Sequence, residues 1–384
     1  MQRKHFVLII AVLSFVMFGL VLFGYPPISR YVIVDLNLSH TESGFITSVF
    51  ALGFALMQVP GGYLADRFGG AKTLPIFAAV VGLSPFIFII GNNFVMALVF
   101  RALAGGACGV TFPSAVRVLS CWFSENEIDS AMSIFGLGYG MSQIVSSAFL
   151  PLLILAGDWR PPLIFTALFS LLVMALAVFP ARWSSPIGSP VDVKVEVRGL
   201  FTCNMFALVL PNLASLAIIV GIFAWTPAFL TSILHLSDEY AGAILGSIGV
   251  ATMLGSYAGG IANKWLGKRR TMGLSMILMM VFAGLLGTSN SGLIAAVWIS
   301  GLGFAGMLYF AADFSLIPYA SKQGRSVAGM TFGVFNTLSN IGTFVSPLFV
   351  GYILDATGNF LLGFAAIGCI GVLGMVGAII LRTD

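Results

Sequence analysis

The chain has 384 residues, of which 59% are hydrophobic and only 8% are charged, and its mean hydropathy is +1.03. Soluble domains carry roughly 25% charged residues, so this composition excludes a soluble globule. The small formal net charge of +4 gives no sign of nucleic-acid binding, because the basic residues stand in short clusters between apolar runs. The composition predicts an all-α integral membrane protein embedded in a lipid bilayer.

The first apolar run follows Arg3, Lys4 and His5 and continues for roughly 20 residues, longer than the ~7 to 15 residues of a signal-peptide core. We interpret it as a retained first spanning helix. Later runs of ~20 or more apolar residues can also cross a hydrocarbon core of ~30 Å. Divided at polar residues, the chain predicts twelve transmembrane helices, at approximately 6–28, 43–65, 73–91, 94–121, 128–154, 160–180, 201–234, 239–262, 271–288, 292–318, 326–353 and 359–381.

An even number of spans places both chain ends on one side of the membrane, and the basic residues indicate which side. With the N-terminus inside, fifteen of the 18 Lys and Arg residues fall on that side, whereas only Arg30 and Arg160 fall outside and Arg101 lies within a helix. Basic residues accumulate in loops that stay in the cytoplasm. The pattern predicts a multi-pass protein of the cell membrane with cytoplasmic N- and C-termini.

The longest polar stretch, near the middle of the chain, predicts a linker between two halves. It contains two prolines and alternating charges, which are typical of a connecting segment. We therefore expect an N-terminal six-helix bundle at 1–182, a cytoplasmic linker at 183–199 and a C-terminal six-helix bundle at 200–384.

The two halves also repeat one another. The segment 36–39 with Gly44 recurs at 234–237 with Gly242, an offset of 198, and landmarks further along recur at 197. Six helices are an even number, so the repeats enter the membrane in the same sense and are related by an axis along the membrane normal. This geometry predicts a central cavity between the two bundles.

The segment PGGYLADRFGGAK, residues 60–72, connects the second predicted helix to the third. It resembles the signature loop GxLaDRxGrr of the major facilitator superfamily of secondary transporters. Arg101, Gly105 and Gly109 are similar to that family's RxxxGxxxG motif. The resemblance covers essentially the whole chain and implies transport by alternating access, with gating assigned to Gly62, Asp66, Arg67, Gly69 and Lys72.

In that family the aspartate of the loop contacts the N-terminal end of the eleventh helix, which here begins near Arg325 and Ser326. The positive end of a helix dipole favours an anion, so the resemblance implies a latch that closes the cytoplasmic side. The run at 121–140, followed by Asp158, resembles branches that carry organic anions, oxalate and formate, nitrate or sugar phosphates. A small anionic molecule is therefore the expected substrate.

Arg101 is the most informative single charge. It stands eight residues into its predicted helix, roughly 12 Å at 1.5 Å per residue. A charge at this depth costs about 2.5 to 3.5 kcal/mol, so it should face the bundle interior and have a partner. Two interpretations remain open: Arg101 binds backbone carbonyls of the first helix, or it attracts an anionic substrate.

Polar or aromatic residues at mid-helix are further candidates for binding substrate. For each one, interhelical hydrogen bonding or packing is the alternative. Trp298 is the repeat counterpart of Arg101, so the two halves are not chemically equivalent across the cavity. The substrate-binding candidates beside Arg101 are Gln58, Tyr139, Gln143, Asn212, Trp225, Tyr257, Trp298, Tyr309, Asn336 and Asn340.

No Asp, Glu or His falls at mid-membrane, where a dedicated proton relay normally needs one. The pattern favours exchange, uniport, or symport in which the substrate site carries the proton. A carrier of a neutral metabolite, or a transporter-like sensor that binds without flux, is the alternative. No nucleophile and base pair, metal cluster or phosphate loop appears, so we expect a protein that is not an enzyme and needs no cofactor or metal. Nothing in the sequence demands more than a monomer, which is the expected state.

Overall fold

The membrane-spanning parts of the chain form helices because hydrocarbon offers no hydrogen-bond partner to an open backbone. The structure, a computed structural model, describes residues 2–123, 125–154, 157–183, 202–314 and 328–381. The first half comprises α1 (Gln2–Phe23), α2 (Ser29–Leu36), α3 (His40–Phe68), α4 (Gly70–Gly91), α5 (Phe94–Trp122), α6 (Glu125–Ile144) and α7 (Arg160–Ala181).

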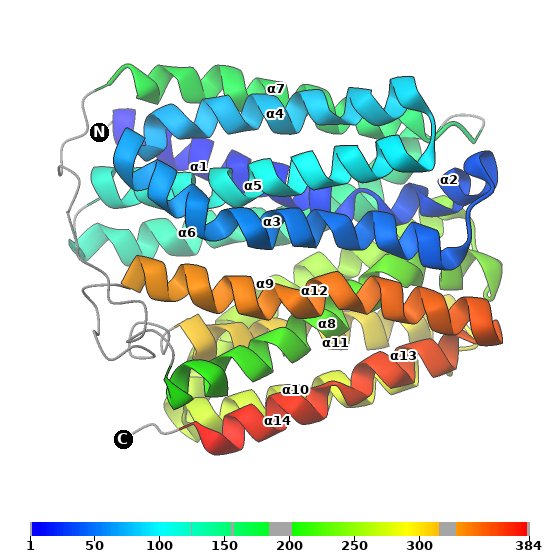
Figure 1. Cartoon of the computed structure of the whole chain (residues 1–384). Helices are drawn as coiled ribbons and strands as arrows, with labels where there is room; N and C mark the ends of the chain where they lie inside the picture. The colour runs from blue at the N-terminus through cyan, green and yellow to red at the C-terminus, as the bar shows by residue number, and fades with distance from the viewer. Residues whose placement is uncertain (1, 124, 155–156, 184–201, 315–327, 382–384) are drawn as a thin grey trace.

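The second half comprises α8 (Cys203–Ser232), α9 (Asp238–Leu266), α10 (Lys268–Leu286), α11 (Gly292–Phe314), α12 (Ala328–Thr357), α13 (Phe360–Cys369) and α14 (Gly371–Ile380). The two bundles lie side by side, and α1 begins at the same end at which α14 ends (Figure 1). We call this the terminal end. The opposite end, where α3 and α9 begin, is called the distal end.

The predicted all-α membrane fold of two six-helix bundles is confirmed. Among the described residues, eleven helices are long and apolar enough to cross a membrane. The remaining predicted span, 128–154, is α6 followed by a π-helical turn over Val145–Phe149 and a 3-10 turn over Leu150–Leu153. Its helical type changes twice, so its α-helical part is only 20 residues long.

Two details differ from the predicted elements. The short helix α2 between the first two spans was not expected, and the last predicted span, 359–381, divides at Ile370 into α13 and α14. Gly368 and Gly371 face Met280 of α10 near this break, so the chain bends where it approaches a neighbour closely. The predicted linker, 183–199, lies outside the described residues except for Trp183.

The repeat seen in the sequence recurs in the backbone. Gly69 ends α3 with φ +88°, and Gly267 ends α9 with φ +80°, a conformation that only glycine adopts readily. Ser39 and Ser237 cap the starts of the same two helices with their side chains. The repeat therefore supplies equivalent starts and ends to α3 and α9.

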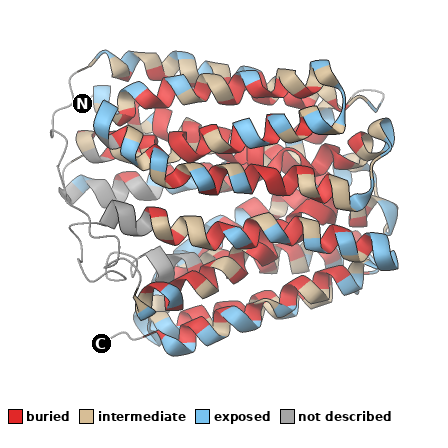
Figure 2. Ribbon diagram, in the orientation of Figure 1, coloured by how far each residue is buried: buried red, intermediate tan, exposed pale blue. Residues whose placement is uncertain are grey.

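Backbone-to-backbone packing joins α3 to α5. A Cβ added to Gly105 would lie 2.1 Å from the carbonyl oxygen of Phe50, and one added to Gly109 would lie 2.7 Å from that of Phe54. Small residues permit such close approach in membranes. Figure 2 shows the buried residues on the helix faces that meet neighbours and the exposed ones on the outer surface, where large apolar side chains such as Leu56 suit contact with lipid.

We predict that Gly105→Ala destabilises the protein by about 1 to 3 kcal/mol, because the methyl group would overlap backbone and separate α3 from α5. The matched control is Gly106→Ala, whose added Cβ would lie 3.4 Å from the flexible side chain of Met57. Thermal unfolding in detergent measures both. Equal melting temperatures for the two variants would contradict the packing argument.

Candidate functional site

The two halves meet along two helix pairs. Helix α3 packs against α12, and α6 with its π turn packs against α9. Glycines allow close contact in the second pair, because a Cβ on Gly249 would lie 2.7 Å from the carbonyl oxygen of Gly140. Residues on these four helices, together with α1 and α8, therefore form the interface between the bundles.

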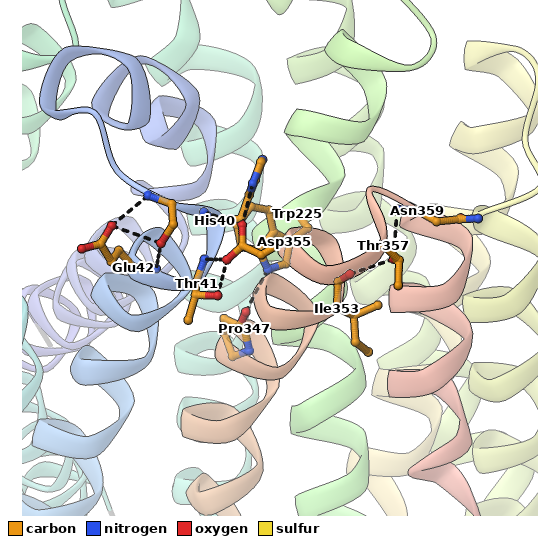
Figure 3. Close-up of polar contacts among 10 residues, drawn as sticks. His40, Thr41, Glu42, Trp225, Pro347, Ile353, Asp355, Thr357 and Asn359 are labelled. Atoms are coloured by element: carbon orange, nitrogen blue, oxygen red, sulfur yellow. Dashed lines mark hydrogen bonds and ion pairs between the residues drawn. The ribbon is translucent and has the colours of Figure 1, made fainter.

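At the distal end, Asp355 of α12 binds the first turn of α3 (Figure 3). Its carboxylate accepts hydrogen bonds from the backbone N–H of His40 at 3.0 Å and of Thr41 at 2.8 Å, and from the Thr41 hydroxyl. The Nδ1 atom of His40 lies 3.0 Å from the same carboxylate. A carboxylate at a helix N-terminus satisfies free N–H groups and complements the helix dipole, so this contact fastens one half to the other.

A second charged contact crosses the distal end between α2 and α9. Asp238, the first residue of α9, accepts a hydrogen bond from the Arg30 guanidinium at 2.5 Å and another from the Tyr31 hydroxyl. The Arg30 side chain is 40% exposed, so solvent weakens the ion pair. Like the Asp355 contact, it nonetheless joins the first half to the second, and the carboxylate again belongs to the second half.

Trp225 belongs to this distal contact region. Its indole Nε1 donates a hydrogen bond to the carbonyl oxygen of Pro347 at 3.0 Å, and its ring lies 5.5 Å from the ring of His40 (Figure 3). Gly44 and Gly351 allow the surrounding backbones to approach closely. The predicted substrate-binding residue Trp225 thus lies where α3, α8 and α12 converge.

Arg101 is fully buried, and its guanidinium is shared among backbone carbonyls. It donates to Val21 of α1 at 2.5 Å, to Ile46 of α3 at 3.2 Å and to Thr47 of α3 at 3.5 Å. The ring of Phe50 lies 4.7 Å from the guanidinium carbon. This geometry agrees with the first of the two interpretations, in which Arg101 binds backbone carbonyls of the first helix. It also includes carbonyls of α3, which that interpretation did not name.

Aromatic rings surround the interior of the first half. Phe18 of α1 contacts Phe54 of α3 at 4.9 Å, and Tyr139 of α6 lies 5.4 Å from Phe23 of α1. Phe23 in turn contacts Phe223 of α8 at 4.7 Å, which carries the ring contacts across to the second half. Tyr139 therefore occupies a position beside the interface.

Two predicted site residues carry buried polar atoms that find no hydrogen-bond partner among the described residues. They are the amide nitrogen of Gln58 on α3 and the amide oxygen of Gln143 on α6, and both side chains are at least 97% buried. A buried unpaired polar group costs about 1 to 3 kcal/mol. Gln58 is one turn beyond Phe54, and Gln143 one turn beyond Tyr139, so each glutamine shares a helix face with one of the aromatic residues of the interior.

Two residues that the sequence reasoning missed are Ser146 and Ser147, in the π turn directly after Gln143. Both hydroxyls are buried and have no hydrogen-bond partner in the part of the chain that the structure describes. π turns are frequent at functional sites. Two adjacent serines after a glutamine, inside an apolar span, were the signal that could have identified them.

The other predicted binding residues are dispersed. Asn340 donates to the backbone carbonyl of Asn336 one turn earlier on α12, so these two amides interact within one helix. Tyr257 is 76% exposed on α9, and Trp298 stacks on Phe282 of α10 at 6.0 Å, remote from the α3 and α12 pair. The remaining two, both buried, are Asn212 of α8 and Tyr309 of α11.

The predicted gating residues lie at the terminal end, where α3 turns into α4. Arg67 donates to the hydroxyl of Tyr63 at 2.6 Å, Gly62 has open space around it, and Lys72 is exposed. Gly69 makes the turn with its positive φ. The side chain of Asp66, and its expected partners Arg325 and Ser326, lie outside the described residues.

Metal ligands do not gather in the described ranges, where no three His, Cys, Asp or Glu side chains approach as a site. The four cysteines there, Cys108, Cys121, Cys203 and Cys369, are free thiols. Away from the charged contacts at the distal end, Gln58, Gln143, Ser146 and Ser147 supply buried amides and hydroxyls, which can bind a solute by hydrogen bonds.

Comparison with known proteins places this geometry in a family. The sequence model of the Major Facilitator Superfamily matches residues 7–347. The chain belongs to this superfamily. The resemblance inferred from the 60–72 loop is confirmed, and this superfamily member is a multi-pass membrane transporter and not an enzyme.

Several curated relatives align with most of this chain. The Escherichia coli K12 protein named "Probable galactarate/D-glucarate transporter GarP" is 25% identical, covering 89% of this chain and 86% of its own. The "Nitrite extrusion protein" of Bacillus subtilis is 26% identical over 95% and 91%, and the "Hexuronate transporter" of the same species is 22% identical over 90% and 86%.

A solved structure shares the fold. A bacterial homologue of the human lysosomal transporter Spinster, in an inward-facing and occupied conformation, superposes with a TM-score of 0.78 at 16% identity. The match covers 99% of this chain and 95% of that one.

We predict that Asp355→Asn loosens the distal contact, because the neutral amide loses the favourable charge at the α3 N-terminus. Loss of about 1 kcal/mol would raise the population open at the distal end about fivefold. This opening can be measured in a chain that also carries Ser147→Cys, because position 147 is buried where the π turn after α6 contacts α9. Opening exposes the introduced thiol, so a thiol reagent should label it faster. The background needs alanine at Cys108, Cys121, Cys203 and Cys369.

The matched control is Asp158→Asn. Asp158 is also a distal carboxylate, but its bonds go to Arg160 within the first half. Equal labelling rates in both variants would show that Asp355 does not hold the halves together.

Proposed function

We propose that this transporter moves a small organic or inorganic anion across the cell membrane by alternating access between its two halves. The observation that carries the proposal is a buried arginine whose charge no carboxylate neutralises among the described residues, in an interior that also holds unpaired amides. The relatives named for galactarate and D-glucarate, for nitrite and for hexuronate support an anionic substrate.

Arg101 acts on the substrate through its field. Its N–H groups are already used by carbonyls, so direct contact is not required of it. At a separation of ~8 Å and an effective dielectric constant of ~20, a unit charge attracts an anion by about 2 kcal/mol. Such an attraction favours anions over neutral solutes of the same shape.

Gln58, Tyr139 and Gln143 are the neutral contacts in this proposal. The amides supply hydrogen-bond donors and acceptors at buried atoms that have no other partner within the described residues, and aromatic rings limit the volume available. Trp225, Asn212, Tyr257, Trp298, Tyr309, Asn336 and Asn340 stay predictions as binding residues.

In this proposal the terminal end is cytoplasmic, which the distribution of the basic residues supports. The distal contacts of Asp355 and Asp238 then close the extracellular side. During the return step, Asp66 and its neighbours Gly62, Arg67, Gly69 and Lys72 would close the cytoplasmic side, as the family resemblance implies. The two closures alternate, so substrate is exposed to one side at a time.

Counterflow in proteoliposomes tests the proposal. Vesicles preloaded with galactarate, glucuronate or nitrite should accumulate the same labelled anion, whereas glucose should not exchange. Exchange of glucose alone would favour a neutral substrate. Binding of an anion without flux would favour a sensor.

We predict that Gln58→Leu and Gln143→Leu each raise the half-saturating concentration of the transported anion by about fivefold to tenfold. Each substitution removes a hydrogen-bonding group that contributes about 1 kcal/mol to binding. The control is Ser84→Ala, since Ser84 is buried within α4 and its hydroxyl binds Val81 of the same helix. An unchanged concentration in both glutamine variants would exclude them from the site.

Arg101 requires two variants, because its substitution affects both stability and charge. Arg101→Lys keeps the charge but loses the three-way hydrogen bonding, so we expect a lower melting temperature with retained preference for anions. Arg101→Gln loses both, and anion affinity should fall about tenfold or more. Retained anion preference in Arg101→Gln would contradict the field argument.

A further inference from the structure

A cavity of about 290 Å³ opens on the second half at the terminal end, between the start of α10 and the end of α14. These two helices run along the side of the second half that faces away from the first half (Figure 1). The cavity is thus on the surface that meets lipid and is separate from the interface between the halves. Its lining residues are Arg269, Arg270, Gly273, Met375, Ala378 and Ile379.

The polar part of this cavity is positively charged. Arg269 donates to the carbonyl oxygen of Ile379 at 2.5 Å, which fixes the start of α10 against the end of α14. Arg270 is exposed, and among the described residues no carboxylate pairs with it. No side chain caps the first turn of α10, because its N-cap residue is Gly267. Free N–H groups, the helix dipole and two guanidinium groups all favour an anionic oxygen.

The other part of the cavity is apolar and leads along the bundle surface. A Cβ added to Gly273 would meet nothing within 4 Å, so this glycine leaves the cavity floor open. Exposed apolar side chains continue from it along both helices, Leu274 and Ile277 on α10 and Val376 and Ile379 on α14. A ligand that fits both parts has an anionic head and a hydrocarbon tail.

We propose that this cavity binds an anionic phospholipid, with the phosphate between Arg269, Arg270 and the first turn of α10 and an acyl chain along α10 and α14. The site lies at the first two turns of α10, the start of the apolar span Lys268–Leu286, where a helix of this length would meet the headgroups of the leaflet at the terminal end. Basic cavities between transmembrane helices on the cytoplasmic side bind such headgroups. The proposal needs a membrane but does not depend on which solute is transported.

The repeat offers a built-in comparison. The first half has Gly70, Ala71 and Lys72 where the second has Lys268, Arg269 and Arg270, and it has Pro75 where the second has Gly273. Gly70 is also covered, because a Cβ there would lie 2.4 Å from the carbonyl oxygen of Ser114. The equivalent place in the first half therefore keeps one basic residue, Lys72, but lacks the charge of Arg269 and the open glycine at position 273.

Native mass spectrometry of the full chain in detergent, titrated with phosphatidylglycerol or phosphatidylcholine, tests the proposal. The unmodified chain should bind phosphatidylglycerol about tenfold more tightly. Arg270→Gln should weaken that binding about fivefold, because one basic residue near an anionic headgroup contributes a factor of this size. Gly273→Leu should weaken it comparably by filling the cavity.

Two matched variants control for general effects. Lys264→Gln removes a basic residue of the terminal end that does not line the cavity, and Gly284→Leu adds the same side chain at another open glycine of α10. Both should bind phosphatidylglycerol as the unmodified chain does. Melting temperatures near that of the unmodified chain show that the variants are folded.

Equal affinity for the two lipids in the unmodified chain, or equal loss in test and control variants, would overturn the proposal. A soluble phosphate-containing anion could bind the same basic groups, and competition with inorganic phosphate at millimolar concentration distinguishes it from a lipid. Inorganic phosphate should not displace the lipid, since it lacks an acyl chain. Displacement by phosphate would identify a site for a soluble anion instead and reject the lipid site.

Discussion

The arrangement of the first half depends on how Arg101 is satisfied inside the membrane. A guanidinium there is tolerated only with several acceptors, and the structure supplies them as carbonyls of α1 and α3. One side chain on α5 thereby fixes two other helices. Those helices carry Phe18, Phe54 and Gln58, so the same interaction sets the position of the candidate site.

The fold could be predicted well because its main determinant is local. A run of ~20 apolar residues specifies a spanning helix wherever it occurs, and hydrocarbon allows no alternative backbone structure. Two features were not predictable in this way: the changes of helix type after Ile144, and the break between α13 and α14 at Ile370. They depend on turn geometry and on contact with another helix, such as Gly371 against Met280, which apolar length does not encode.

The candidate site could be predicted less completely. Gln58, Tyr139 and Gln143 were recognisable as polar or aromatic residues at mid-helix, and the structure places them beside the interior. Trp298, selected as the repeat counterpart of Arg101, instead stacks on Phe282. An equivalent position in the repeat does not specify which neighbour a side chain meets. Asp355 was not singled out as a contact between the halves, since its partners lie about 315 positions earlier in the chain.

The distal contact is chemically one-sided in a way that bears on its variation among sequences. On α3, two of its donors are backbone N–H groups. Any residue except proline at positions 40 and 41 preserves them, whereas on α12 everything depends on the carboxylate of Asp355. Loss of the carboxylate at position 355 therefore removes every hydrogen bond of this contact at once. Substitutions at positions 40 and 41 remove only the side-chain bonds of His40 and Thr41, and the separate contact of Asp238 with Arg30 stays in place in either case.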